Sequence, residues 1–188
     1  MTSFTATVTA CEADKKGFAV RLDRTAFYPE GGGQPFDTGT LDAVAVDEVH
    51  ERDGEVVHYC AAPLPAGARV TGRIHWARRF DLMQQHSGEH IVSGLIHAAY
   101  GYDNTGFHIG HDAVTIDLSG ELDAGQLLEI ETRANETVWR NEAVRCFYPD
   151  AGTLAALPYR SKKALTGAVR LVEFPGADLC ACCGTHVG

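Results

Sequence analysis

The chain has 188 residues, of which 45% are hydrophobic, and its formal net charge is −9, from 16 basic and 25 acidic residues. This length fits one large domain or two small ones, with enough apolar residues for a packed core. The acidic balance argues against broad non-specific binding to DNA or other nucleic acids, because such binding needs many phosphate contacts.

Membrane insertion and secretion are also disfavoured. No apolar run is long enough to span a bilayer, and the first residues do not resemble a signal peptide. There are six cysteines, three of them within residues 180–183, which fits a reducing compartment and a metal site better than a disulfide framework. We therefore expect a cytoplasmic protein with no membrane partner.

Residues 1–76 are expected to form a small β-barrel. Alternating apolar and polar residues predict short strands at 4–9, 18–22, 44–51, 55–60 and 68–76. The third and fourth of these segments flank Asp53-Gly54, a dipeptide typical of a tight hairpin turn. Several short strands separated by turn residues are typical of a small closed sheet.

Between the second and third segments lie three consecutive glycines, Gly31, Gly32 and Gly33, followed by Gln34. Each glycine costs backbone entropy when it is ordered, so packing does not explain the run. It is either a flexible linker or an ordered loop whose backbone N–H groups approach a ligand. Aromatic and proline residues on both sides, from Phe27 to Pro35, favour the ordered loop.

From residue 77 to residue 188 the pattern changes to that of an α+β domain. An apolar period of 3.6 residues predicts two long helices, at 79–100 and 123–141. In the second helix five apolar side chains are expected to face inward: Leu127, Leu128, Ile130, Ala134 and Val138. The shorter elements are a hairpin of 107–110 with 113–118, strands at 144–148 and 168–174, and a short helix at 152–157. This mixture predicts two layers, with the helices on one face of a sheet.

Two pairs of metal-ligand residues stand out in this second domain. His86 and His90 are four residues apart, and so are Cys182 and His186. On a helix, residues at this spacing share one face with a rise of about 6 Å, and two imidazoles can then reach one zinc ion. Together the two pairs predict a zinc site with three histidines and one cysteine.

The alternatives are ordinary ones. The two histidines could lie at the edge of the core, and the cysteines could be small buried side chains. Cys180 or Cys183 could also take the place of Cys182 as the ligand.

The run from His75 to His90, HWARRFDLMQQHSGEH, resembles the central motif of the alanyl-tRNA synthetase editing domain. The C-terminal CCGTH and the Gly-Gly-Gly-Gln loop resemble the same family. More narrowly, the chain is similar to the free-standing AlaX trans-editing proteins, in the longer type that carries a glycine-rich barrel. The family continues into further strands beyond the position of Gly188, so the resemblance implies that C-terminal strands are missing.

This resemblance implies an aminoacyl-tRNA deacylase. Its substrate would be mischarged tRNA(Ala), chiefly Ser-tRNA(Ala), with Gly-tRNA(Ala) as a second candidate. The zinc-ligand places fall on His86, His90, Cys182 and His186. A polar pocket place falls on His108, and the loop with Gln34 would lean over the pocket. His108 and Thr105 are the candidate partners for the serine hydroxyl.

Two basic groups are candidate tRNA contacts, Arg78 with Arg79 and Lys162 with Lys163. Short charge runs are, however, usually solvated surface.

Two rival functions stay open. The run from His86 to His90 fits H-x-x-E-H, the inverted zinc-protease motif, in which Glu89 would be the general base. Alternatively, the domain is a non-catalytic, zinc-stapled module that binds tRNA or a synthetase, and metal removal would unfold it.

Overall fold

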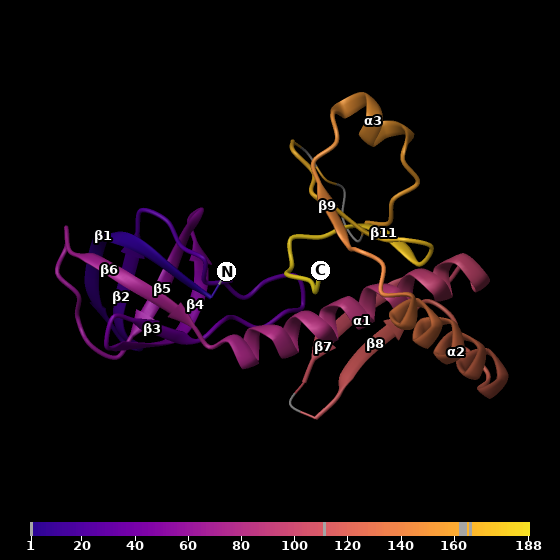
Figure 1. The fold of residues 1–188 in the computed structure, drawn as a ribbon, viewed down its shortest axis with the longest axis horizontal. Helices are drawn as coiled ribbons and strands as arrows, with labels where there is room; N and C mark the ends of the chain where they lie inside the picture. Colours follow the sequence, from indigo (N-terminus) through magenta and orange to yellow (C-terminus); the bar gives the residue numbers. More distant parts are fainter. Residues whose placement is uncertain (1, 111, 162–164, 166) are drawn as a thin grey trace. The chain divides into compact units, whose positions relative to one another are not determined.

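The computed structural model describes residues 2–110, 112–161, 165 and 167–188 (Figure 1). Lys162 and Lys163 therefore lie outside the described residues. The chain divides into two compact units, Met1–Leu82 and Met83–Gly188. The division falls inside a helix, α1 (Trp76–Tyr100), rather than at residue 76.

The first unit is a closed antiparallel barrel, which confirms the predicted barrel. Its strands follow one another around the barrel in the order β1-β2-β5-β4-β3-β6. Their bounds are β1 (Ser3–Asp14), β2 (Gly17–Leu22), β3 (Gly39–Leu41), β4 (Val44–Arg52), β5 (Glu55–Cys60) and β6 (Arg69–Ile74). Closure requires β1 to pair on both edges, with Ser3 opposite Arg73 and Val8 opposite Leu22. The core side chains include Val20, Leu41 and Val49, all fully buried.

The glycine-rich segment is an ordered tight turn. Gly31 and Gln34 exchange both backbone hydrogen bonds, at 3.1 and 3.0 Å. Gly32 and Gly33 between them have φ values of +58° and +82°, which side chains other than glycine rarely adopt. Two consecutive positive φ values are the signature of a two-residue hairpin turn. The observed geometry is therefore that of an ordered loop rather than a linker.

The start of α1 is fastened to the barrel unit by a buried ion pair. The Nε of Arg79 donates to Asp37 Oδ1 over 2.8 Å, and its Nη2 donates to the carbonyl of Ala26, also over 2.8 Å. Asp37 is fully buried and also accepts from the backbone N–H of Tyr28 over 2.7 Å. These contacts explain why the first unit extends through Leu82.

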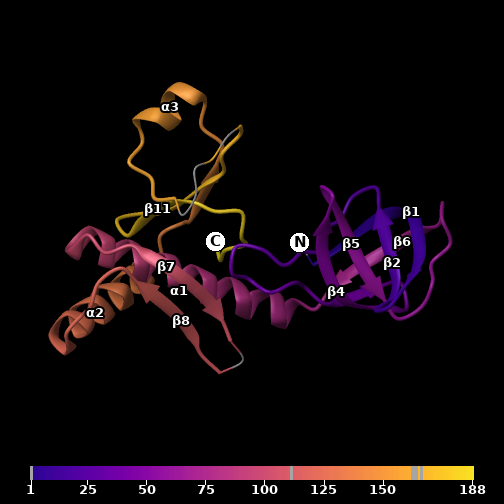
Figure 2. The ribbon, with the colours of Figure 1, turned by 180° about the vertical axis from the view of Figure 1, so that it is seen from behind.

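The second unit combines α1 with two further helices and two small sheets. The helices are α2 (Ala124–Arg140) and α3 (Ala151–Ala156). The strands are β7 (Asn104–Ile109), β8 (Val114–Leu118), β9 (Arg145–Phe147), β10 (Leu171–Phe174) and β11 (Asp178–Ala181). Figures 1 and 2 both show the β7–β8 hairpin alongside α1. The α+β class is confirmed, but in the described ranges the strands form two separate sheets instead of the single sheet expected.

One expectation about α2 is wrong. Ile130 is buried and Ala134 packs against the same core cluster, but Leu127, Leu128 and Val138 are 54%, 63% and 59% exposed. The helix packs through a narrow stripe that includes Ile130 and Ala134, and these three side chains lie outside that stripe. None of the helices within the described ranges combines the length and apolarity needed to cross a bilayer.

Candidate metal centre

Four metal-ligand side chains converge in the second unit. His86 and His90 project from one face of α1 with ring centroids 5.2 Å apart, and both are 2% exposed. The segment after β11 brings Cys182 and His186 to the same face. One ligand atom from each of the four residues lies within 4.8 Å of all the others. The structure thus brings together the four side chains that the spacing singled out.

The geometry of this cluster suits a tetrahedral ion. The Sγ of Cys182 lies 3.5 Å from Nε2 of His86. Bonds of about 2.3 Å to sulfur and about 2.05 Å to nitrogen, at a tetrahedral angle, would separate the two atoms by about 3.6 Å. The Nε2 of His186 is buried and has no hydrogen-bond partner among the described residues. A buried nitrogen lone pair without a donor is costly for a protein but is what a metal ligand requires.

Neighbouring groups orient His186 toward this role. Its Nδ1 lies 3.5 Å from the hydroxyl of Ser87, which also accepts from the backbone N–H of Val187 over 3.2 Å. With Nδ1 as the donor to Ser87, the tautomer leaves the lone pair on Nε2.

The ionisation states also suit a cation. Burial alone would raise the pKa of the Cys182 thiol, but the neighbouring imidazoles of His186, His86 and His90 lower it to about 3. Burial lowers the pKa of His186 to about 4. Burial also disfavours charged His90, but its hydrogen bonds to Asp178 and Cys182 outweigh this and raise its pKa to about 9. The cluster thus holds a thiolate and one extra proton, which a divalent cation would displace.

Buried polar contacts fix the orientation of the His90 ring through Nδ1. Its Nδ1 lies 2.8 Å from Oδ2 of Asp178, so Nδ1 carries the proton and Nε2 faces the other ligand atoms. Arg160 grips both oxygens of Asp178, with Nε to Oδ1 at 2.8 Å and Nη2 to Oδ2 at 2.9 Å. A carboxylate behind a histidine is the usual way in which proteins orient an imidazole toward a metal.

Two glycines allow the close approaches that the cluster needs. A Cβ on Gly94 would lie 2.3 Å from the carbonyl oxygen of Ala177 and 2.6 Å from Cβ of Asp178. A Cβ on Gly184 would lie 2.2 Å from Cε1 of His86. The first glycine lets the start of β11 reach α1, and the second lets the ligand loop fold over His86.

The loop of residues 182–186, which carries two of the ligands, is fixed by hydrogen bonds from the guanidinium of Arg170. Its Nη1 donates to the carbonyl oxygens of Cys182 and Gly184, at 2.7 and 3.0 Å. The backbone N–H of Gly184 in turn donates to Sγ of Cys182 over 3.2 Å. These bonds fix the direction in which the thiolate points.

The other two cysteines near this loop are placed differently. Cys183 is exposed. Cys180 is buried, which raises the pKa of its thiol to about 12, and it forms a second possible ligand group with His90 and Asp178. In that group Asp178 already binds Arg160 and His90, so its charge is compensated without an ion. The geometry favours Cys182 as the sulfur ligand.

Glu89 takes part in a separate buried network. Its Oε1 accepts from the hydroxyl of Ser93 over 2.8 Å and from the side-chain amide of Asn104. Asn104 also donates to the Ser93 oxygen over 3.1 Å. The carboxylate is 7% exposed and belongs to neither group of possible metal ligands. This placement does not support Glu89 as the base of an inverted-motif protease.

The remaining predicted site residues contribute no ligand to the cluster. His108 is exposed on β7 next to Phe107, whose ring lies 5.3 Å from that of His86. Because adjacent strand residues face opposite ways, His108 points away from the His86 side. The hydroxyl of Thr105 donates to the carbonyl of Asp117 over 3.1 Å. Gln34 is fully buried and belongs to the other unit.

The two described basic residues differ from each other. Arg78 is exposed, donates to the carbonyl of Phe36 over 3.1 Å and lies 5.7 Å from the centre of its ring. Arg79 is 8% exposed and is engaged by Asp37. Arg79 is therefore a structural residue and a poor tRNA contact, which corrects the expectation for it.

Sequence reasoning missed the residues that support the ligands. Asp178 could have been suspected as a carboxylate just before the ligand cysteine, since histidine ligands usually have such partners. Arg160 and Arg170 gave no signal, because nothing in a sequence tells which arginine turns inward. Asn104 likewise stands in no sequence pattern that indicates a buried role.

Comparisons with known proteins match most of the chain. Residues 2–78 match the family model described as tRNA synthetases class II (A). The alanyl-tRNA editing protein AlaX-M of Methanosarcina acetivorans is 35% identical, over 89% of this chain and 77% of that protein. AlaX-L of Pyrococcus horikoshii is 32% identical, over 93% of this chain and 45% of that protein. The alanyl-tRNA editing protein Aarsd1 of Danio rerio is 35% identical, over 91% of this chain. The chain spans only 42% of that last protein.

Proposed function

Because the chain belongs to the family of alanyl-tRNA editing proteins, we propose that it hydrolyses the ester bond of mischarged tRNA(Ala). The substrate proposed first is Ser-tRNA(Ala), and Gly-tRNA(Ala) is the second. The observation that carries the proposal is the convergence of His86, His90, Cys182 and His186, whose ligand atoms lie within 4.8 Å of one another.

We propose zinc as the ion of this cluster. Imidazole nitrogen and thiolate sulfur are the usual protein ligands of zinc, and the 3.5 Å between Sγ of Cys182 and Nε2 of His86 suits such a site. Bound there, zinc would supply a Lewis acid beside the ester carbonyl. The four side chains complete a tetrahedral set, which is the pattern of structural sites. The ligands would therefore act chiefly by ordering the 182–186 loop and the pocket around it.

An aminoacyl ester is already activated, so modest catalysis suffices. The protein has to position a water and the ester and stabilise the charge that develops on the carbonyl oxygen. No protein nucleophile is needed, and Glu89 is tied to Ser93 and Asn104.

Selection of serine over alanine needs more than size. A pocket that only excludes bulk separates the two poorly, whereas a site built to bind the serine hydroxyl leaves polar groups unpaired when alanine enters. Thr105 is the proposed pocket residue, to be tested by single substitution.

A deacylation assay with parallel metal analysis tests the proposal. The full chain should release serine from Ser-tRNA(Ala) but leave Ala-tRNA(Ala) largely intact, and it should contain about one zinc per chain. The variants His90→Ala and Cys182→Ala should contain no zinc, and their rate of Ser-tRNA(Ala) deacylation should fall at least tenfold. Arg78→Ala should weaken tRNA binding and lessen its salt dependence, as expected for a phosphate contact.

The two rival functions predict different results. A protease would cleave peptides and lose that activity in Glu89→Gln. A zinc-stapled binding module would bind tRNA without any ester turnover and unfold when zinc is removed. If metal-free variants deacylate Ser-tRNA(Ala) at the full rate, zinc is not required for the reaction.

A further inference from the structure

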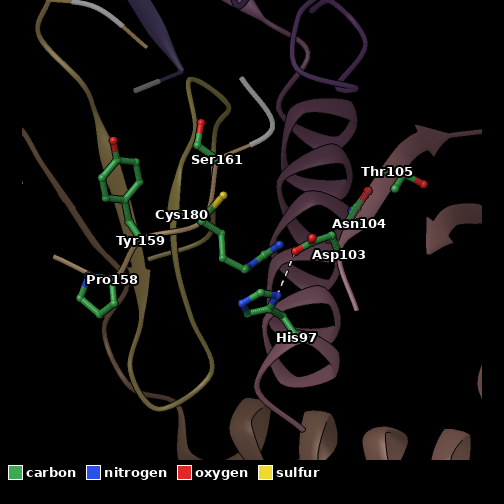
Figure 3. A pocket seen from close by; sticks show the side chains of 9 residues that line it. His97, Asp103, Asn104, Thr105, Pro158, Tyr159, Ser161 and Cys180 are labelled. Atoms are coloured by element: carbon green, nitrogen blue, oxygen red, sulfur yellow. Dashed lines mark ion pairs between the residues drawn. The ribbon is translucent and has the colours of Figure 1, made fainter. Parts of the chain in front are cut away.

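The second unit contains a pocket of about 640 Å³ that the ligand cluster does not use. Its walls come from the end of α1, the start of β7, residues 158–161 and β11. Figure 3 shows Tyr159 and Cys180 on one side of α1 and Asn104 on the other. The ion pair of His97 and Asp103, with 3.0 Å between Nδ1 and Oδ1, lies between them.

The buried side chain of Asn104 has one unmet hydrogen-bonding group. Its amide nitrogen donates to Glu89 and to Ser93, and this fixes the amide orientation, since a flip would turn Oδ1 toward the Glu89 carboxylate. The remaining Oδ1 is buried without a hydrogen-bond partner among the described residues. Leaving such a buried acceptor unpaired destabilises the fold. A donor from outside the protein would relieve this cost.

The charges around the pocket are already matched in pairs. Arg160 uses Nε and Nη2 on Asp178, and His97 is paired with Asp103. A phosphate or another full anion would therefore find little uncompensated positive charge in the described wall. A neutral, polar ligand suits the pocket better.

The volume points to a ligand larger than water or a free amino acid. A water molecule occupies about 30 Å³ of liquid, whereas pockets for small organic ligands measure about 300–1,000 Å³. Tyr159 adds an aromatic ring to the wall. Unpaired RNA bases stack on aromatic rings and arginine planes, and the ribose 2′-hydroxyl both donates and accepts hydrogen bonds.

We propose that this pocket binds a nucleoside of the single-stranded end of the RNA substrate, with its ribose hydroxyls toward Asn104 and Arg160 and its base against Tyr159. The inference rests on the proposed function. It assigns the substrate an anchoring point on the same helix as His86 and His90, about 10 Å further along the axis at His97. The bound RNA end would thus lie along α1.

Adenosine is the probe for this site. Calorimetric titration of the full, metal-loaded chain should give saturable binding, and 2′-deoxyadenosine should bind at least threefold more weakly. Tyr159→Ala should weaken adenosine binding roughly 5- to 150-fold, which corresponds to about 1–3 kcal/mol for a stacked base. Tyr148→Ala is the matched control, because Tyr148 is 66% exposed and does not line the pocket, and its affinity should stay within twofold.

A measurement on the unaltered chain guards against a variant that fails to fold. Adenosine should shift the NMR resonances of the Asn104 side-chain amide. No saturable binding, no shift at Asn104, or equal losses in the two tyrosine variants would each overturn the inference. Deacylation of Ser-tRNA(Ala) is measured in parallel. Hydrolysis without adenosine binding overturns the pocket alone, whereas adenosine binding without hydrolysis overturns the proposed function and leaves nucleoside binding in place.

Discussion

Asp178 accepts a hydrogen bond from Nδ1 of His90 over 2.8 Å, and both side chains are almost completely buried. This contact decides which nitrogen of His90 faces the other three ligand atoms. Arg160 holds the Asp178 carboxylate through two further bonds and lines the pocket next to the cluster. The ligand set is thus connected through Asp178 to Arg160, which is part of the pocket wall.

Removing that carboxylate should weaken metal binding. We expect Asp178→Ala to lower zinc affinity about 10- to 100-fold, measured by competition with a chelator, because the His90 ring loses its tautomer and its orientation. Asp103→Ala is the matched control. It removes another histidine–aspartate pair, but one whose side chains are 43% and 68% exposed and that lies outside the cluster. Equal zinc affinity in the two variants would refute the role of Asp178.

Two glycines of α1 should respond to alanine in opposite directions. A Cβ on Gly88 meets nothing within 4 Å, so Gly88→Ala should stabilise the fold by up to about 1 kcal/mol through helix propensity. A Cβ on Gly94 would collide with Ala177 and Asp178. Gly94→Ala should therefore destabilise by about 1–3 kcal/mol. Urea unfolding measures both, and stabilisation by Gly94→Ala would show that β11 does not pack as described.

The two neighbouring arginines at the start of α1 should also differ. Arg79→Met leaves the fully buried Asp37 carboxylate without its cation, and loss of one partner of a buried pair costs about 3–5 kcal/mol. Arg78→Met removes an exposed side chain and should change the free energy of unfolding by less than about 0.5 kcal/mol. If thermal unfolding gives equal losses for both, the burial of the Arg79 pair is refuted.

The sequence predicted those parts of the molecule that local patterns encode. Alternation, helical periodicity and four-residue spacing predict five of the six barrel strands, the long helix α1 and the pairs His86/His90 and Cys182/His186. The sequence did not predict the three-residue strand β3 or the four-residue strand β11, because so few residues show no periodicity. The exposure of apolar side chains on α2 was not predicted either. The apolar period tells which residues share a helix face, but not how much of that face packs against the core.

The supporting residues could not be predicted for a different reason. Arg160 reaches Asp178 from 18 positions away, and Asn104 reaches Glu89 from 15. Such pairings depend on how α1, β7 and β11 pack together. No local pattern in the chain carries that information.

His108→Ala should leave substrate selection nearly unchanged. The side chain is exposed on the strand face opposite Phe107, whose ring lies 5.3 Å from that of His86. We expect the ratio of Ser-tRNA(Ala) to Ala-tRNA(Ala) hydrolysis to stay within about twofold, since removal of an exposed side chain away from a site has little effect on it. A large fall in this hydrolysis ratio in His108→Ala would contradict the prediction and indicate that His108 contacts the substrate. An unchanged unfolding midpoint of the variant would show that the fall is not caused by a destabilised fold.

Buried His58 should make the stability of the protein fall in mild acid. Its Nδ1 donates to the carbonyl of Val20 over 3.1 Å, and Nε2 accepts from the hydroxyl of Thr25 over 2.8 Å, so the fold holds the neutral ring. Burial lowers its pKa to about 4, whereas the unfolded chain titrates near 6.5. Stability is therefore fully present above pH 6.5 and is lost as the pH falls toward 4, by about 3 kcal/mol over that interval.

Urea unfolding of the full chain between pH 7 and 4 measures this slope, and a variant separates His58 from the other histidines. His58→Gln cannot take up the proton, so its stability should fall by about 3 kcal/mol less than that of the unaltered chain over the same interval. His75→Gln, at an exposed position, should keep the full slope. The metal-ligand histidines are unaltered in all three proteins, so their contribution cancels in the comparison. Parallel curves for His58→Gln and the unaltered chain would mean that the buried ring is protonated in the fold.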